Sequence, residues 1–156
     1  MTGRPGKRWF AASAVLLVLL GLAHVAAIFG GANWYASLGA PDDIVRMARA
    51  GKRFPETVSL LIALVCLLWA SYAFSGAGLV RRLPLLRTVL ALLAAGMIAR
   101  AVGFIAVLAV SPNALALVCN CRGIDAMVIT TSAICLAIGA GITVGLQREW
   151  HLPKLK

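Results

Sequence analysis

The feature that most constrains this chain is a set of four long apolar runs. They cover about residues 9–29, 57–80, 84–110 and 124–146. A helix needs roughly 20 residues to cross a hydrocarbon layer about 30 Å thick, and each run reaches that length. Polar and apolar residues do not alternate within the runs, which favours helices over barrel strands. The sequence therefore predicts one all-α membrane domain over residues 1–156, a four-transmembrane-helix bundle.

Composition excludes a soluble domain. Of the 156 residues, 62% are hydrophobic and only 13% are charged. A soluble domain of this size would need more polar surface, because most of its residues would face water. The basic residues before the first run resemble the start of a signal peptide. The run continues through Phe29 without a polar break and three more runs follow, so we expect the first span to stay uncleaved.

Lysines and arginines in the short loops predict the orientation of the spans. Nine lie on one side of the predicted bundle: Arg4, Lys7, Arg8, Arg81, Arg82, Arg87, Arg148, Lys154 and Lys156. Five lie on the other side, with four acidic residues beside them: Arg46, Arg49, Lys52, Arg53 and Arg122. We therefore expect a multi-pass protein of a bacterial inner membrane with both termini in the cytoplasm.

The net charge of +10 then follows from this topology and from attraction to anionic membrane lipids. A nucleic-acid partner is not expected, because no soluble domain is present to carry a basic patch. In the first outer loop, Pro41, Asp42 and Asp43 are typical of a helix N-terminus, and Gly51 would end that helix. We expect a short interfacial helix there.

Several stretches resemble a group of small four-span bacterial membrane proteins. They are GLAH, NWYASLGAP, FSGAGLVRRLPLLR and SAICLAIG. The resemblance covers most of the chain and implies an architecture but no activity. In layout alone, the chain is also distantly similar to compact four-helix proteins of the DoxX and EXPERA kind.

A single arginine, Arg100, lies near the middle of the third apolar run. A cation at that depth is costly and normally has a partner or a water-filled route. No Asp or Glu lies in the core of any predicted span, while Gly96 and Gly103 share the helix face of Arg100. Three partners stay open: backbone carbonyls and hydroxyls, an outer-loop acid such as Glu56 or Asp125, or a bound anion.

His24 is the only histidine within a predicted span. It should lie about 9 Å below the outer end of the first span. Thr130, Thr131 and Ser132 are expected at a similar depth, and Arg100 is expected a little deeper. These residues predict a polar ligand pocket in the outer half of the bundle, although each side chain could instead be a hydrogen-bonded packing residue.

Two other groups have alternative interpretations. Cys119 and Cys121 could bind a soft metal such as Cu(I), but no nearby His or Met completes the ligand set. No metal and no cofactor are therefore expected. Ala137, Gly141 and Gly145 form a face of small residues. This face would dock another membrane protein or a second copy, or it would pack inside the bundle.

The sequence contains no paired carboxylates, no Ser/His/Asp set and no phosphate-binding loop, which argues against catalysis. We expect a non-catalytic accessory subunit, or a subunit that binds a small ligand or lipid. One alternative is a small transporter or permease that uses Arg100 and His24. A weaker alternative is a membrane enzyme acting on lipid-like substrates.

Overall fold

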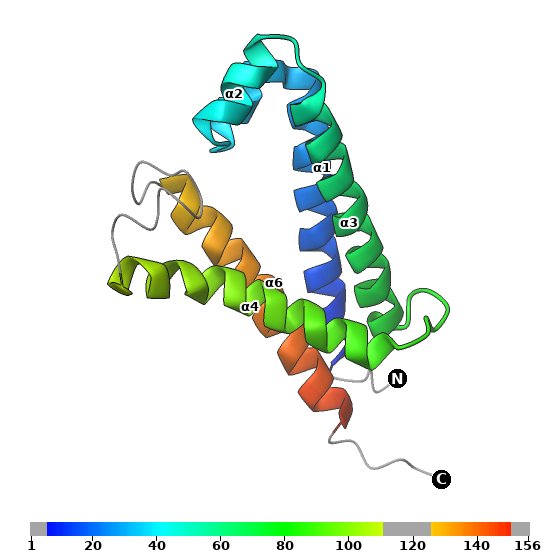
Figure 1. Cartoon of the computed structure of the whole chain (residues 1–156). Helices are drawn as coiled ribbons and strands as arrows, with labels where there is room; N and C mark the ends of the chain where they lie inside the picture. The colour runs from blue at the N-terminus through cyan, green and yellow to red at the C-terminus, as the bar shows by residue number, and fades with distance from the viewer. Residues whose placement is uncertain (1–5, 111–125, 151–156) are drawn as a thin grey trace.

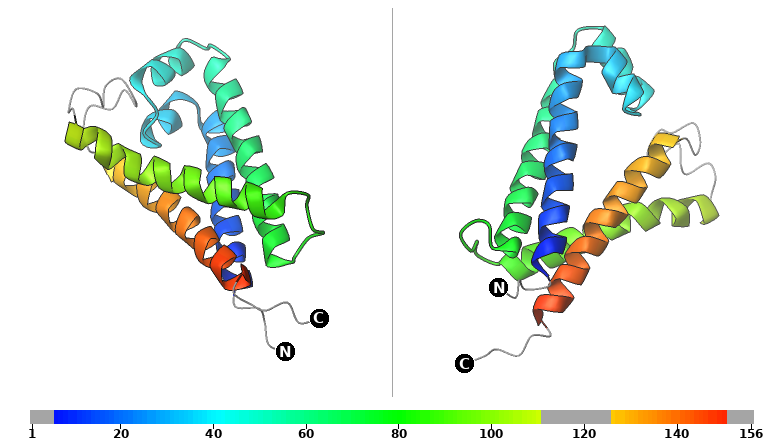
Figure 2. Two further views of the ribbon diagram at one scale, coloured as in Figure 1. Left: turned by 60° about the horizontal axis from the view of Figure 1, so that its bottom comes forward. Right: turned by 180° about the vertical axis from the view of Figure 1, so that it is seen from behind.

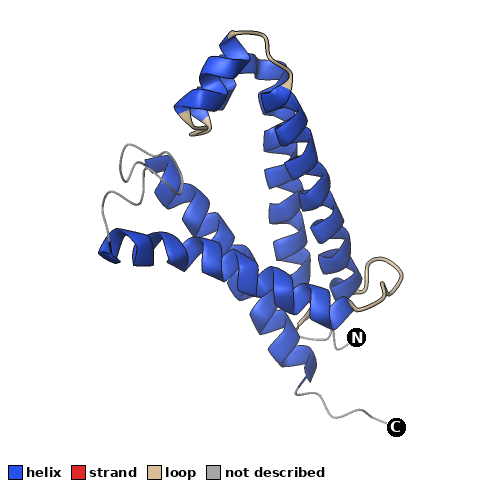
Figure 3. Cartoon of the chain, in the orientation of Figure 1, coloured by secondary structure: helices blue, strands red, loops and turns tan. Residues whose placement is uncertain are grey.

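The computed structural model describes residues 6–110 and 126–150, and this part of the chain contains helices and loops but no strand (Figure 1, Figure 3). The helices are α1 (Lys7–Ser37), α2 (Asp42–Arg49), α3 (Phe54–Ala77), α4 (Leu86–Val110) and α6 (Ala126–Trp150). Among them, all but α2 are long and apolar enough to cross a membrane. The predicted four-span helical architecture is confirmed, and so is the short helix in the first loop.

α1 departs most from the predicted boundaries, because it runs to Ser37 instead of ending near Phe29. Gly31 interrupts its regular geometry with φ 65° and ψ −156°. Glycine adopts such a positive φ at little cost because it has no Cβ. The straight part of α1 therefore ends close to the predicted boundary, and the last turns are redirected towards α2.

The other helix ends follow from ordinary signals. α2 carries acidic residues in its first turn and basic residues in its last, which complements the helix dipole. α3 begins with Pro55 in its first turn and ends at Gly78, whose φ of 74° is the left-handed conformation of a glycine C-cap.

The four long helices form two antiparallel pairs, α1 with α3 and α4 with α6 (Figure 1). The pairs meet where α1 and α4 begin and diverge towards the other end of the molecule (Figure 2). We call the meeting end the basic end. Its described cations are Lys7, Arg8, Arg81, Arg82, Arg87 and Arg148.

The main core lies at the basic end and draws on all four long helices. Phe10 and Leu17 of α1 pack with Leu90 of α4 and with Ile138 and Ile142 of α6, and small residues of α3 complete the cluster. Phe10 is only 2% exposed. Because lipid is as apolar as these side chains, close packing rather than escape from water holds the helices together.

Glycines allow α1 and α6 to approach closely. A Cβ added at Gly145 would lie 2.8 Å from the ring of Phe10, and one at Gly141 would lie 2.5 Å from the Oγ of Ser13. The Ser13 hydroxyl donates a hydrogen bond of 3.3 Å to the backbone carbonyl of Ile138. Helix backbones this close gain extensive van der Waals contact.

The contacts of Gly141 and Gly145 with α1 also concern the prediction that Ala137, Gly141 and Gly145 form a docking face. α1 covers Gly141 and Gly145 from within the chain, whereas Ala137 is exposed on α6. The three residues therefore do not form one open surface in the structure.

At the opposite end, α2 folds back onto the last turns of α1. Val45 of α2 packs with Ala27 and Tyr35 of α1 in a small second cluster. Gly39, just after α1, lies close to Met127 of α6, because a Cβ there would be 3.0 Å from the Met127 Cβ. This corner is a point of approach between the two helix pairs beyond the basic end.

Candidate ligand-binding pocket

Among the residues predicted to form a polar pocket in the outer half, His24 and the threonines make local hydrogen bonds. The half-buried His24 has its Nδ1 2.9 Å from the carbonyl of Leu20, one turn earlier in α1. The hydroxyls of Thr130 and Thr131 donate to backbone carbonyls of their own helix at 2.7 and 2.8 Å. Local bonds of this kind satisfy a polar group inside an apolar helix.

Ser132 and Arg100 differ from these three residues. The Ser132 hydroxyl oxygen is buried and has no hydrogen-bond partner among the described residues. Arg100 is exposed on α4, although it lies close enough to Cys135 of α6 for its charge to act on the thiol. The described residues do not enclose Arg100, because the two helix pairs diverge in that half.

A cavity of about 440 Å³ lies at the basic end instead. Its lining comes from the starts of α1 and α4, the ends of α3 and α6, and the loop between α3 and α4. We call it the basic pocket. The residues that line it are Lys7, Phe10, Ser75, Gly76, Gly78, Arg82, Leu83, Leu85, Leu86, Arg87, Thr88, Leu90, Leu146 and Glu149.

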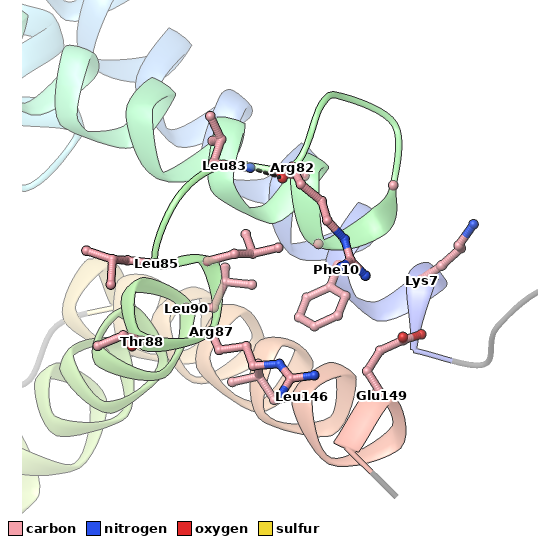
Figure 4. A pocket seen from close by; sticks show the side chains of 14 residues that line it. Lys7, Phe10, Arg82, Leu83, Leu85, Arg87, Thr88, Leu90, Leu146 and Glu149 are labelled. Carbon is pink, nitrogen blue, oxygen red and sulfur yellow. Dashed lines mark hydrogen bonds between the residues drawn. The ribbon is translucent and has the colours of Figure 1, made fainter. Parts of the chain in front are cut away.

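The basic pocket combines an apolar floor with a charged rim. Figure 4 shows the charged ends of Arg82, Arg87 and Glu149 around the ring of Phe10. Lys7 adds a third cation, so the lining holds three cationic side chains and one carboxylate. An amphipathic anion suits such a site, because its charge can meet the arginines while its apolar part lies on the floor.

Ser75 fixes the loop that carries Arg82. Its buried hydroxyl donates to the carbonyl of Arg81 and accepts from the backbone N–H of Leu83, each at 3.0 Å. One side chain thus anchors the backbone on both sides of Arg82, and Figure 4 draws the bond to Leu83. The cation is therefore presented from an ordered loop rather than from a freely moving one.

The same loop contains the backbone strain of this region. Leu85 has φ 53°, the one positive φ outside glycine among the described residues, and its side chain is 75% exposed. A bulky residue in this conformation costs of order 1–3 kcal/mol, and such strain tends to cluster at ligand sites. The strain at Leu85 indicates that contacts elsewhere in the fold hold the loop in this conformation.

α6 contributes to the pocket through its last turn. Gly6, at the start of α1, lies against α6, since a Cβ there would be 2.8 Å from the Gly145 carbonyl and 2.9 Å from the Glu149 Cγ. The Glu149 side chain is thereby held at the positive end of the α1 dipole. Nearby, the guanidinium of Arg148 lies 5.8 Å from the centre of the Trp9 ring, within cation–π range.

The sequence interpretation did not identify this pocket. It related the arginines of RRLPLLR and the N-terminal lysine to topology and to general attraction for anionic lipids, although charges from three helix ends on one side also predict a shared site. No group of three or more His, Cys, Asp or Glu residues suited to a metal occurs in the described part of the chain. Cys119 and Cys121 lie outside the described residues.

Comparisons with protein-family models, curated proteins and solved structures find no match to this chain. The resemblance to small four-span membrane proteins, and the likeness to DoxX and EXPERA proteins in layout, therefore stay predictions.

Proposed function

We propose that the protein is a non-catalytic membrane subunit that binds an anionic phospholipid in the basic pocket. The observation that carries this proposal is that Lys7, Arg82 and Arg87 line one pocket together with the buried ring of Phe10. Hydrogen bonds from cationic groups to a phosphate are about twice as strong as neutral ones. The apolar floor would take the beginning of an acyl chain.

The position of the pocket supports a lipid rather than a fully soluble ligand. It lies where two of the candidate spans begin and two end, which is the level of the lipid headgroups. A lipid can reach this level by diffusing within the membrane. Its headgroup then contacts cationic side chains of the pocket, while its tail stays in the hydrocarbon layer.

We further propose that the basic end faces the cytoplasm of a bacterial inner membrane. Six described cations and one carboxylate lie at this end, against four cations and three carboxylates at the other. The excess of Lys and Arg in short cytoplasmic loops supports that orientation. Reporter fusions after Lys156 and within Asp42–Glu56 should report the cytoplasm and the exterior; the reverse pattern would overturn the orientation.

Native mass spectrometry tests the lipid proposal on the full chain. The protein is mixed with phosphatidylglycerol or phosphatidylcholine, and the bound fraction of each lipid is measured. We expect phosphatidylglycerol to be preferred. Lys7→Gln combined with Arg82→Gln should weaken its binding at least tenfold, because each charged contact contributes about 1.5–3 kcal/mol.

The matched control is Lys52→Gln with Arg53→Gln, which removes two exposed cations at the opposite end. This variant should bind phosphatidylglycerol like the wild type. Equal binding of the two lipids by the wild type, or an equal loss in both double variants, would contradict the proposal.

A further inference from the structure

Arg100 lies at a depth where lipid headgroups do not neutralise it. It follows the start of α4 by fourteen residues and precedes Val110 by ten, which places it about 21 Å and 15 Å from the two helix ends. In an α4 that crosses a hydrocarbon layer about 30 Å thick, this position is near the middle. A cation there costs several kcal/mol unless a counter-charge or water accompanies it.

The described chain supplies no carboxylate at that depth. The acidic residues of the described part all lie in α2 or in the terminal turn of a long helix: Asp42, Asp43, Glu56 and Glu149. The exposed Arg100 side chain has no ion pair within this part of the chain. Within the described residues Arg100 therefore has no counter-charge, and a molecule that reaches the middle of the membrane can supply one.

The surface around Arg100 has room for a neighbouring helix. A Cβ added at Gly96 or at Gly103, one turn before and one turn after Arg100, would meet no atom of the described residues within 4 Å. The adjoining Ala99 is also exposed. We call the surface formed by Gly96, Ala99, Arg100 and Gly103 the Arg100 face. Small residues beside a long cation let a second backbone come close while the guanidinium reaches across.

We propose that the Arg100 face docks a transmembrane helix of another protein that carries an Asp or Glu near its middle. Charge complementarity selects this occupant. Lipid tails cannot supply the counter-charge, and lipid phosphates lie at the membrane surface. A second copy docking through the same face would place two Arg100 guanidinium groups together, which is repulsive in a medium of low dielectric constant.

The probe for this proposal is a synthetic transmembrane peptide of leucine and alanine with one central Asp. Full-length protein carrying a donor fluorophore is reconstituted with acceptor-labelled peptide in phosphatidylcholine vesicles, and energy transfer is titrated. We expect saturable transfer for the Asp peptide and at least tenfold weaker association for a peptide with Asn at that position. The neutral lipid keeps this result independent of the basic pocket.

Variants of the chain assign the effect to the Arg100 face. Arg100→Leu should abolish the preference for Asp over Asn, and Arg100→Lys should keep part of it. Gly96→Leu with Gly103→Leu should weaken association by obstructing close approach while the charge remains. The control Arg46→Leu changes an exposed arginine of α2 and should leave association unchanged.

Equal transfer for the Asp and Asn peptides would overturn the proposal. So would an undiminished preference in Arg100→Leu, or self-association of the wild type through the Arg100 face that the Asp peptide fails to displace. Circular dichroism checks that each variant keeps its helix content. If Arg100→Leu unfolds, the glycine pair still decides the result, because both positions lie in open space.

Discussion

Glycines at the basic end and glycines in the outer part of α4 have opposite surroundings, although all lie in long apolar helices. Gly141 and Gly145 are buried, and a Cβ at either position would overlap a side chain of α1. Within the part of the chain that the structure describes, a Cβ at Gly96 or Gly103 would meet nothing within 4 Å. The same residue type thus serves close packing within the chain at one end and leaves surface available at the other.

This difference indicates how the two ends are used. At the basic end all four long helices share one core, so the apolar side chains that line the pocket are held in place by close packing. Further along, contacts are mostly within each helix pair, and the approach of Gly39 to Met127 is an exception. The packed end suits a preformed ligand site, and the divergent half suits a docking surface.

Phe10→Ala should produce the largest loss of stability. The ring touches α3, α4 and α6 neighbours and is almost fully buried. We expect the free energy of unfolding to fall by about 3 kcal/mol. This value is at the lower end of the range for truncation of a buried aromatic side chain, because lipid is as apolar as this core. The control Phe29→Ala removes a ring that is 86% exposed in the same helix and should change little. Thermal unfolding in detergent measures both; similar shifts would refute the placement of the main core at the basic end.

Gly145→Val should have the next largest effect, compared with Gly96→Val as its matched partner. Both substitutions place the same branched side chain in a helix, so intrinsic helix preference cancels. Only Gly145 has the Phe10 ring 2.8 Å from an added Cβ. We expect Gly145→Val to lower the free energy of unfolding by about 2 kcal/mol through overpacking, and Gly96→Val to be about as stable as the wild type. Equal melting temperatures for the two variants would contradict the difference in packing between Gly145 and Gly96.

Ser75→Ala should have a smaller effect that appears in both stability and lipid affinity. It removes the hydroxyl that holds the loop on both sides of Arg82, at a cost of about 1 kcal/mol. The control is Ser71→Ala, since the exposed Ser71 hydroxyl bonds only one turn back to the Leu67 carbonyl. Phosphatidylglycerol affinity should fall severalfold in Ser75→Ala alone. Unchanged affinity there would show that the loop anchor does not position Arg82.

The long helices were predictable from the sequence because apolar run length alone determines which segments can cross a membrane. The end of α1 differs from the predicted one because of the break at Gly31. A pattern of apolar residues does not show whether a helix bends at a glycine or continues regularly through it. The short α2 was also predictable, from its acidic first turn and the glycine after it.

The site was harder to predict, because it depends on how the two helix pairs are set against each other. Run length places His24, Arg100 and Thr131 at similar depths, but depth does not fix which helix faces meet. Likewise, loop charges locate Lys7 and Arg82 on one side without showing that both line one pocket with Phe10. Close approach at Gly141 and Gly145 brings those helix ends together, and the spacing of small residues left open whether that face is internal.

Covalent mapping of a bound lipid tests the central claim most directly. The full-length protein in vesicles is irradiated with a phosphatidylglycerol analogue that carries a photoreactive group in its headgroup, and labelled peptides are identified by mass spectrometry. The account predicts adducts concentrated within residues 75–90, which include Ser75, Arg82 and Arg87, and strongly reduced in Lys7→Gln with Arg82→Gln. Adducts concentrated within residues 34–53, at the opposite end, with no reduction in that variant, would contradict it.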